Sequence, residues 1–294
     1  MDQKGDVRWL IKCLSVGLVL LLACGLCTAW LGSRALQMPA TTTRDGTLIT
    51  LNRYKTEPVP DIVLVGSSLT YRLKEEYFDI ARVRNLALVG GSPLTGLEIV
   101  ARQSRLPKLV LVEMNVMTRP VDASLVKKYS EDSSIEPLFA RPLRLAVAFY
   151  ENWMHAPLSH SQISIDGLLK QPPSDFDNHV YVDRAVQQLE AEDPSVEASA
   201  NVDGVRQMIP ELENKGTRVL LFELPVADRL ERTKSVEITG AIVHAAFPKT
   251  NRWLPIDVDR SDLRWADGAH LDERSAVMVV EAIETALRTL KYAD

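Results

Sequence analysis

The chain has 294 residues, of which 46% are hydrophobic and 25% are charged, and its formal net charge is −5. This composition is typical of a globular protein with a core of good size. The negative net charge and the lack of a basic stripe in the sequence argue against a protein that binds nucleic acid.

The N-terminal segment predicts a membrane anchor. Residues 13–33 contain no charged residue, and at ~1.5 Å per residue a helix of this length is just long enough to cross the hydrocarbon core of a bilayer. The basic residues Lys4, Arg8 and Lys12 precede it, so residues 1–12 are expected in the cytoplasm. We therefore expect a single-pass signal anchor in a bacterial inner membrane, with the rest of the chain in the periplasm.

Two other interpretations of this segment stay open. A cleaved signal peptide usually has a shorter apolar region, whereas here the apolar run continues through Trp30 and Leu31. The residues Leu21-Leu22-Ala23-Cys24 are similar to a bacterial lipoprotein cleavage box, although the residues after Cys24 remain apolar. The uncleaved anchor is favoured over both.

All the cysteines of the chain, Cys13, Cys24 and Cys27, lie in this segment. The remainder of the chain therefore has no disulfide framework, no cysteine nucleophile and no cysteine-based metal site. A domain without cysteine suits the bacterial periplasm, where stray thiols are oxidised.

The segment after the anchor is polar and leads into a strand. Residues 34–60 end in Pro58-Val59-Pro60 and predict a stalk, with a short extended piece at Thr47–Leu51. Residues 61–65 predict a strand that is buried on both faces, because four of the five are apolar and three of those are β-branched. Gly66 ends this strand, and a helix is expected from Ser68 to about Phe78.

The rest of the chain predicts alternating strands and helices. Further strands are expected at 83–89, 109–115, 218–224 and 254–258. Helices are expected after Pro93, with Leu94, Leu97 and Val100 on one face, and at about 196–216, 229–246 and 272–292. This alternation predicts a doubly wound parallel sheet, so residues 61–294 form one α/β domain. Residues of about 117–194 break the pattern and predict a helical insertion.

Two short motifs carry the chemistry. Gly66-Ser67-Ser68 places a hydroxyl at the carboxyl edge of the sheet, where open α/β sheets keep their sites, although such a turn often only caps a helix. Asp267 and His270 are three positions apart, so the carboxylate could fix the imidazole through Nδ1 and leave Nε2 free to take a proton from a serine. The plain alternative is a helix cap beside a surface histidine. The place of Asp267 and His270 in the chain favours the catalytic interpretation, because the last strand-to-helix loop of such a sheet lies near the loop after the first strand.

Together these motifs resemble the SGNH (GDSL-like) hydrolase superfamily, over about residues 60–115 and 195–292. The resemblance implies a three-layer α/β/α, SGNH-like (flavodoxin-like) domain. It implies Ser68 as the nucleophile, His270 as the general base and Asp267 as the residue that orients the base.

The resemblance also implies an oxyanion hole. Members of the superfamily build it from the serine N–H, a glycine after the second strand and an asparagine after the third. Ser68, Gly91 (or Gly90) and Asn115 occupy those places here. Such fixed donors stabilise the charge that develops in acyl transfer.

The sequence departs from the family pattern at two places. Ser67 replaces the usual aspartate of Gly-Asp-Ser, and Glu113-Met114-Asn115-Val116 replaces the usual Gly-x-Asn-Asp. Similar departures occur in membrane-anchored, polysaccharide-modifying branches of the superfamily, such as the alginate acetylation proteins. They argue against a simple lipase-type esterase more than against the triad.

The remaining histidines predict no metal site. His155 and His160 lack a nearby carboxylate cluster, and His179 and His244 stand alone in the sequence. We expect neither a metal nor another cofactor, because ester hydrolysis by a serine triad needs none.

The expected function is therefore that of a periplasmic, membrane-anchored serine esterase or O-acetyltransferase. Its implied partners are an acylated (chiefly acetylated) glycan or a small ester, and, for a transferase, a membrane protein that donates the acyl group. Hydrolysis and transfer share an acyl-serine intermediate, so both remain open. The competing hypothesis is a non-catalytic glycan-binding or scaffold subunit with the same fold.

Overall fold

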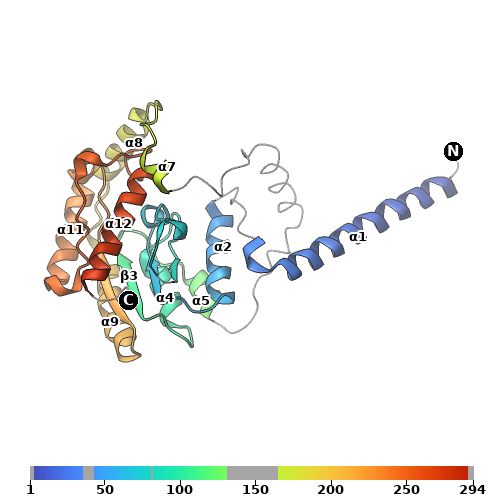
Figure 1. Ribbon diagram of the computed structural model, residues 1–294, viewed down its shortest axis with the longest axis horizontal. Helices are drawn as coiled ribbons and strands as arrows, with labels where there is room; N and C mark the ends of the chain where they lie inside the picture. The colour runs from blue at the N-terminus through green and yellow to red at the C-terminus, as the bar shows by residue number, and fades with distance from the viewer. Residues whose placement is uncertain (1–2, 36–42, 81, 131–164, 291–294) are drawn as a thin grey trace. The chain divides into compact units, whose positions relative to one another are not determined.

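The computed structural model describes residues 3–35, 43–80, 82–130 and 165–290 (Figure 1). The chain divides into two compact units, residues 1–57 with 133–160, and residues 58–132 with 161–294. The candidate site lies entirely in the second unit, which carries the sheet.

The first unit contains the helices α1 (Gln3–Ala35) and α2 (Thr43–Thr56). Among the side chains that the structure describes, no helix combines the length and the apolar character that a membrane span requires. The predicted anchor at 13–33 includes residues whose side chains lie outside the described set, and it stays a prediction.

The prediction of a short extended segment at Thr47–Leu51 is wrong, because these residues belong to helix α2. Leu51 and Tyr54, three positions apart on this helix, are both buried, so burial overrides the weak helix propensity of its threonines. The helix ends before Pro58, since a proline disfavours the helical conformation of the residue before it.

The second unit is organised around a four-stranded parallel sheet. Its strands are β1 (Ile62–Val65), β2 (Val83–Asn85), β3 (Leu109–Glu113) and β4 (Arg218–Phe222), in the order β2-β1-β3-β4. The connections from β1 and β3 leave in opposite directions along the sheet. Their carboxyl ends therefore flank a topological switch point, the place where open α/β sheets form a crevice.

Two strand predictions need correction. The fifth strand expected at 254–258 is reduced to a single bridge between Trp253 and Leu221 and a hydrogen bond from Leu254 N to Leu221 O (2.8 Å). Pro255 follows and has no N–H to continue the ladder. Strand β2 is also shorter than expected and ends at Asn85.

Helices pack against both faces of the sheet, an arrangement compatible with the predicted α/β/α layering. On one face, Ile62, Leu64 and the matching residues of β3 and β4 join a core with the apolar side of α12 (Glu273–Thr289). On the other face, α4 (Pro93–Ala101) lies so close to β1 that a Cβ at Gly96 would be 3.3 Å from Val65. Helix α9 (Ser195–Asn214) packs on α4 in turn.

The remaining helices follow the predicted positions with two interruptions. The helix expected from Ser68 to Phe78 is split into α3 (Ser68–Tyr71) and η1 (Glu75–Tyr77), and the one expected at 229–246 is split into α10 (Asp228–Glu231) and α11 (Lys234–Ala246). The helices expected at 196–216 and 272–292 are confirmed as α9 and α12. Two short elements, η3 (Thr250–Arg252) and η4 (Arg260–Asp262), occupy the connection before α12.

The predicted insertion at 117–194 is helical where it is described. It contains α5 (Ala123–Ser130), α7 (Ile165–Leu169) and α8 (His179–Ala191). Residues 131–164, which include His155 and His160, lie outside the described residues.

Candidate active site

The turn after β1 presents Ser68 at the carboxyl edge of the sheet. Ser67 is the N-cap of α3, and its Oγ accepts a hydrogen bond from Leu69 N (3.2 Å). Gly66 is required here, because a Cβ at this position would lie 2.3 Å from Thr70 Oγ1 and 2.7 Å from Glu113 Oε2. Ser68 is thereby held as the first residue of a short helix.

The three residues of the predicted triad form one chain of hydrogen bonds. Ser68 Oγ lies 2.8 Å from His270 Nε2, and His270 Nδ1 lies 2.7 Å from Asp267 Oδ2. With the Nδ1 proton donated to the carboxylate, Nε2 is left as the acceptor for the serine hydroxyl. The fold thus brings together residues 202 positions apart in the arrangement that activates a serine.

A tight turn holds the carboxylate and the imidazole together. Trp265 and Leu271 form an antiparallel bridge, and Ala266 N donates to His270 O (2.8 Å). Gly268, inside this turn, has a φ of +87°, which favours glycine. The loop therefore closes on itself before α12 begins.

Hydrogen bonds inside this turn also set the charge of Asp267. Its Oδ1 accepts from His270 N (2.8 Å) and from Ala269 N (3.2 Å), while Oδ2 faces the imidazole. Partial burial alone would raise the pKa of Asp267, but the hydrogen bonds from the His270 side chain and backbone lower it to about 2. The carboxylate is therefore ionised at neutral pH and favours the Nδ1–H form of His270.

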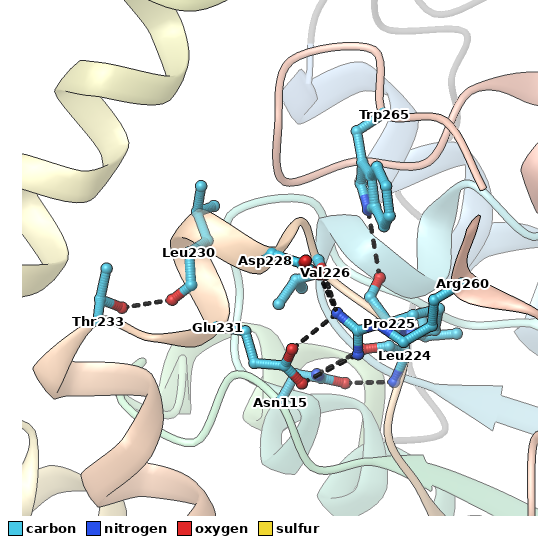
Figure 2. A network of polar contacts seen from close by, with 10 residues as sticks. All are labelled: Asn115, Leu224, Pro225, Val226, Asp228, Leu230, Glu231, Thr233, Arg260 and Trp265. Atoms are coloured by element: carbon cyan, nitrogen blue, oxygen red, sulfur yellow. Dashed lines mark hydrogen bonds and ion pairs between the residues drawn. The ribbon is translucent and has the colours of Figure 1, made fainter. Parts of the chain in front are cut away.

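Asn115 follows β3 and is fixed by the neighbouring chain after β4. Its Oδ1 accepts from Leu224 N (2.7 Å) and its Nδ2 donates to Leu224 O (2.9 Å), as Figure 2 shows. These two bonds determine which amide atom is which. An amide carries two N–H bonds, and the second one on Nδ2 has no partner among the described residues, so it remains for a ligand.

The glycines after β2 differ in their backbone N–H groups. Gly91, the first choice for the oxyanion hole, donates its N–H to Leu88 O (2.8 Å) within a turn. Gly90 has a φ of +75°, and among the described residues its N–H has no hydrogen-bond partner. Of the two alternatives, Gly90 is the one with an N–H left for a substrate oxygen.

The sequence predicts no role in the site for Glu113, which belongs to a segment that departs from the family pattern. Its side chain is fully buried and accepts from Ser67 N (2.8 Å), Ser67 Oγ (2.8 Å) and Thr70 Oγ1 (2.6 Å). Burial raises the pKa of Glu113, and these hydrogen bonds offset part of that rise. The carboxylate thus sits directly beneath the turn that carries Ser68.

A cavity of about 1290 Å³ opens at the candidate triad. Ser68, His270, Gly90 and Asn115 line one part of it, and residues of α8, α10, α11 and the loops that follow β3 and β4 line most of the rest. Ligand pockets for drug-sized molecules measure about 300–1,000 Å³, so this cavity has room for much more than an acetyl group. On the wall of this cavity, the guanidinium of Arg260 forms ion pairs with Glu231 and Asp228 of α10 (Figure 2).

His244 does not stand alone as the sequence suggested. Its Nε2 lies 3.1 Å from Glu223 Oε2, and its ring stacks on Trp253 with a centroid distance of 4.7 Å. Among the described residues, no group of three or more His, Cys, Asp or Glu side chains is arranged to hold a metal ion. His179 lies at the start of α8, where its N–H donates to Asp177.

No known family model matches the chain, and no curated protein is significantly similar to it in sequence.

Proposed function

We propose that the protein is an SGNH-type serine esterase or O-acyltransferase that forms an acyl-enzyme at Ser68. The observation that carries the proposal is the continuous hydrogen-bond chain from Ser68 Oγ through His270 to Asp267. The surroundings support it, since the serine lies at the switch point of a parallel sheet and opens into a large cavity.

In the proposed reaction, His270 Nε2 takes the hydroxyl proton of Ser68 as Oγ attacks the ester carbonyl. The tetrahedral intermediate places a negative charge on the former carbonyl oxygen. His270 then gives the proton to the departing alcohol, which leaves the acyl group on Ser68. Water or a sugar hydroxyl attacks this acyl-serine in the second half, and His270 again accepts the proton.

Three donors are available for the oxyanion. They are the N–H of Ser68, the N–H of Gly90 and the second N–H of Asn115 Nδ2, and none of them is bonded to a described residue. All three groups line the cavity. One such donor can be worth ~3 kcal/mol of transition-state stabilisation.

For the substrate, we propose an acyl ester, chiefly an acetyl ester, of a glycan at the cell surface or in the periplasm. The resemblance to membrane-anchored, polysaccharide-modifying branches supports this class, and the cavity is large enough for an acylated sugar. Exposed apolar side chains on α1, such as Leu14 and Leu18, support the anchor. A reporter fused after residue 45 should be active only outside the cytoplasm, and activity inside the cytoplasm would overturn this location.

The acyl chemistry is tested by turnover of an acetyl ester such as p-nitrophenyl acetate. Ser68→Ala and His270→Ala should each lower kcat/KM by about 10³ or more. His244→Ala is the matched control, because this histidine also lines the cavity and also faces a carboxylate, yet should leave turnover near normal. Equal turnover by Ser68→Ala and the unaltered protein would exclude the proposed mechanism.

A further inference from the structure

The backbone around Ser68 uses nearly all of its donors internally. Ser67 N and Thr70 N donate to Glu113 Oε2 (2.8 and 3.3 Å), and Leu69 N donates to Ser67 Oγ (3.2 Å). The N–H of Ser68, between them, has no partner among the described residues. One amide of this turn is therefore left for a substrate, and it belongs to the residue that carries the nucleophile.

A single buried carboxylate organises this pattern. Glu113 Oε2 also accepts from Thr70 Oγ1 (2.6 Å), and Glu113 Oε1 accepts from Ser67 Oγ (2.8 Å). The carboxylate thus binds the turn on both sides of Ser68, at the residue before it and at the residue two positions after it. Four donors of the turn, the N–H and hydroxyl groups of Ser67 and of Thr70, are thus bound to one side chain, which restricts the movement of the turn.

The position of Glu113 is costly for a residue that only fills space. It ends β3, whose other residues Leu109–Val112 are apolar, and its side chain is 0% exposed. Burial of a carboxylate without a cation is unfavourable unless hydrogen bonds replace its water. Glu284, another buried carboxylate, also binds backbone N–H groups but has Arg288 beside it. Within the described residues, the hydrogen-bond partners of the Glu113 side chain are neutral groups of the Ser68 turn.

We propose that Glu113 is a positioning residue for acyl transfer, a role that rests on the proposed function. By occupying the N–H and hydroxyl groups next to Ser68, it fixes the turn so that the Ser68 N–H faces the oxygen on which charge develops. Such a donor is stronger when it is held in place before the reaction. Weakening the carboxylate's contacts should therefore lower kcat and leave KM nearly unchanged, because the effect falls on the transition state.

Thr70 offers a matched pair of variants for this test. Thr70→Val keeps the shape of the buried side chain but removes the hydroxyl that binds Glu113, whereas Thr70→Ser keeps the hydroxyl. With an acetyl ester as substrate, Thr70→Val should lower kcat about tenfold at unchanged KM, and Thr70→Ser should stay within about twofold of normal. Glu113→Gln, which keeps the shape but replaces one accepting oxygen with a donating NH2 group, should lower kcat by about 10².

The controls separate this inference from the function on which it rests. Turnover that does not depend on Ser68 would overturn the acyl-transfer proposal and this role with it. Turnover that depends on Ser68 but is unchanged in both Thr70→Val and Glu113→Gln would overturn only the role of Glu113. Equal losses in Thr70→Val and Thr70→Ser would also overturn it, because they would reflect packing rather than the hydroxyl. If Glu113→Gln does not fold, the Thr70 pair still decides.

Discussion

Two carboxylates flank Ser68, and their surroundings are opposite. Glu113 is fully buried at the end of a central strand, and burial raises its pKa. Asp267 lies in a partly exposed turn, where hydrogen bonds from His270 outweigh the effect of burial and lower its pKa to about 2. One carboxyl group, that of Glu113, thus binds the backbone beside the nucleophile, and the other, that of Asp267, binds the imidazole.

The two halves of the site are held in place by contacts of different range along the chain. The Ser68 turn is tied to the sheet through contacts that span 43 to 46 positions in the chain. Asp267 and His270 are instead joined by hydrogen bonds within three positions, with Gly268 between them, although Asn178 also donates to the carbonyl oxygen of Trp265. Substitutions around Ser68 should therefore act through the fold of the sheet. Substitutions at Asp267 should act chiefly on the turn that holds His270.

The largest effect is expected when the local half is broken at Asp267. Asp267→Asn should lower kcat by about 10⁴, the loss seen in serine proteases when an amide favours the wrong imidazole tautomer. The variant should also lose the stability that the low pKa of Asp267 contributes at neutral pH, so the melting temperature should fall moderately. Ester turnover and thermal unfolding measured on the same variant would test both statements, and near-normal turnover would rule out Asp267 as the orienting residue.

A smaller but still large effect is expected at Asn115. Asn115→Ala should lower kcat by about 10² to 10³ with little change in KM, because the amide acts on the transition state. Asn115→Asp is an informative control, since it keeps an acceptor for Leu224 N but has no N–H. Recovery of activity in Asn115→Asp would show that the clamp to Leu224 matters and the donor does not.

The smallest effect concerns stability and pH. The pKa of Glu113 is raised in the folded protein. Ionisation of this side chain therefore lowers the stability of the fold as pH rises above 4.5, the ordinary pKa of a glutamate. The pKa of Asp267 is lowered, so it contributes stability above about pH 4 that is lost as pH falls towards its folded pKa of about 2.

Melting temperatures from pH 3 to pH 8 would test these opposite signs. The melting temperature of Glu113→Gln, relative to that of the unaltered protein, should rise with pH. That of Asp267→Asn should fall with pH over the acid range. Parallel curves for both variants would mean that the two carboxylates have similar surroundings.

The sequence predicted the parts of the site that rest on local patterns. A buried strand ending at Gly66 and the spacing of Asp267 and His270 are both visible within a few residues. The partners of Glu113 are not, because Ser67 and Thr70 lie on a different strand connection and meet it only in the folded chain.

The same physical limit explains the other differences. The N–H of Gly91 is used by a turn whose geometry the sequence does not display. Pro255 allows one bridge but no fifth strand, and helix α2 forms where its apolar side chains are buried despite several threonines. In each case a long-range contact or a single hydrogen bond decides between alternatives that local propensity leaves close in energy.

The most direct test of a nucleophilic Ser68 is covalent labelling by a fluorophosphonate, followed by peptide mapping. We expect that Ser68 is labelled in the full-length protein, that Ser68→Ala is not labelled, and that His270→Ala reacts far more slowly. Absence of labelling in folded protein, or labelling at a different serine, would contradict the role of Ser68 as nucleophile, and absence of labelling would favour a non-catalytic glycan-binding subunit.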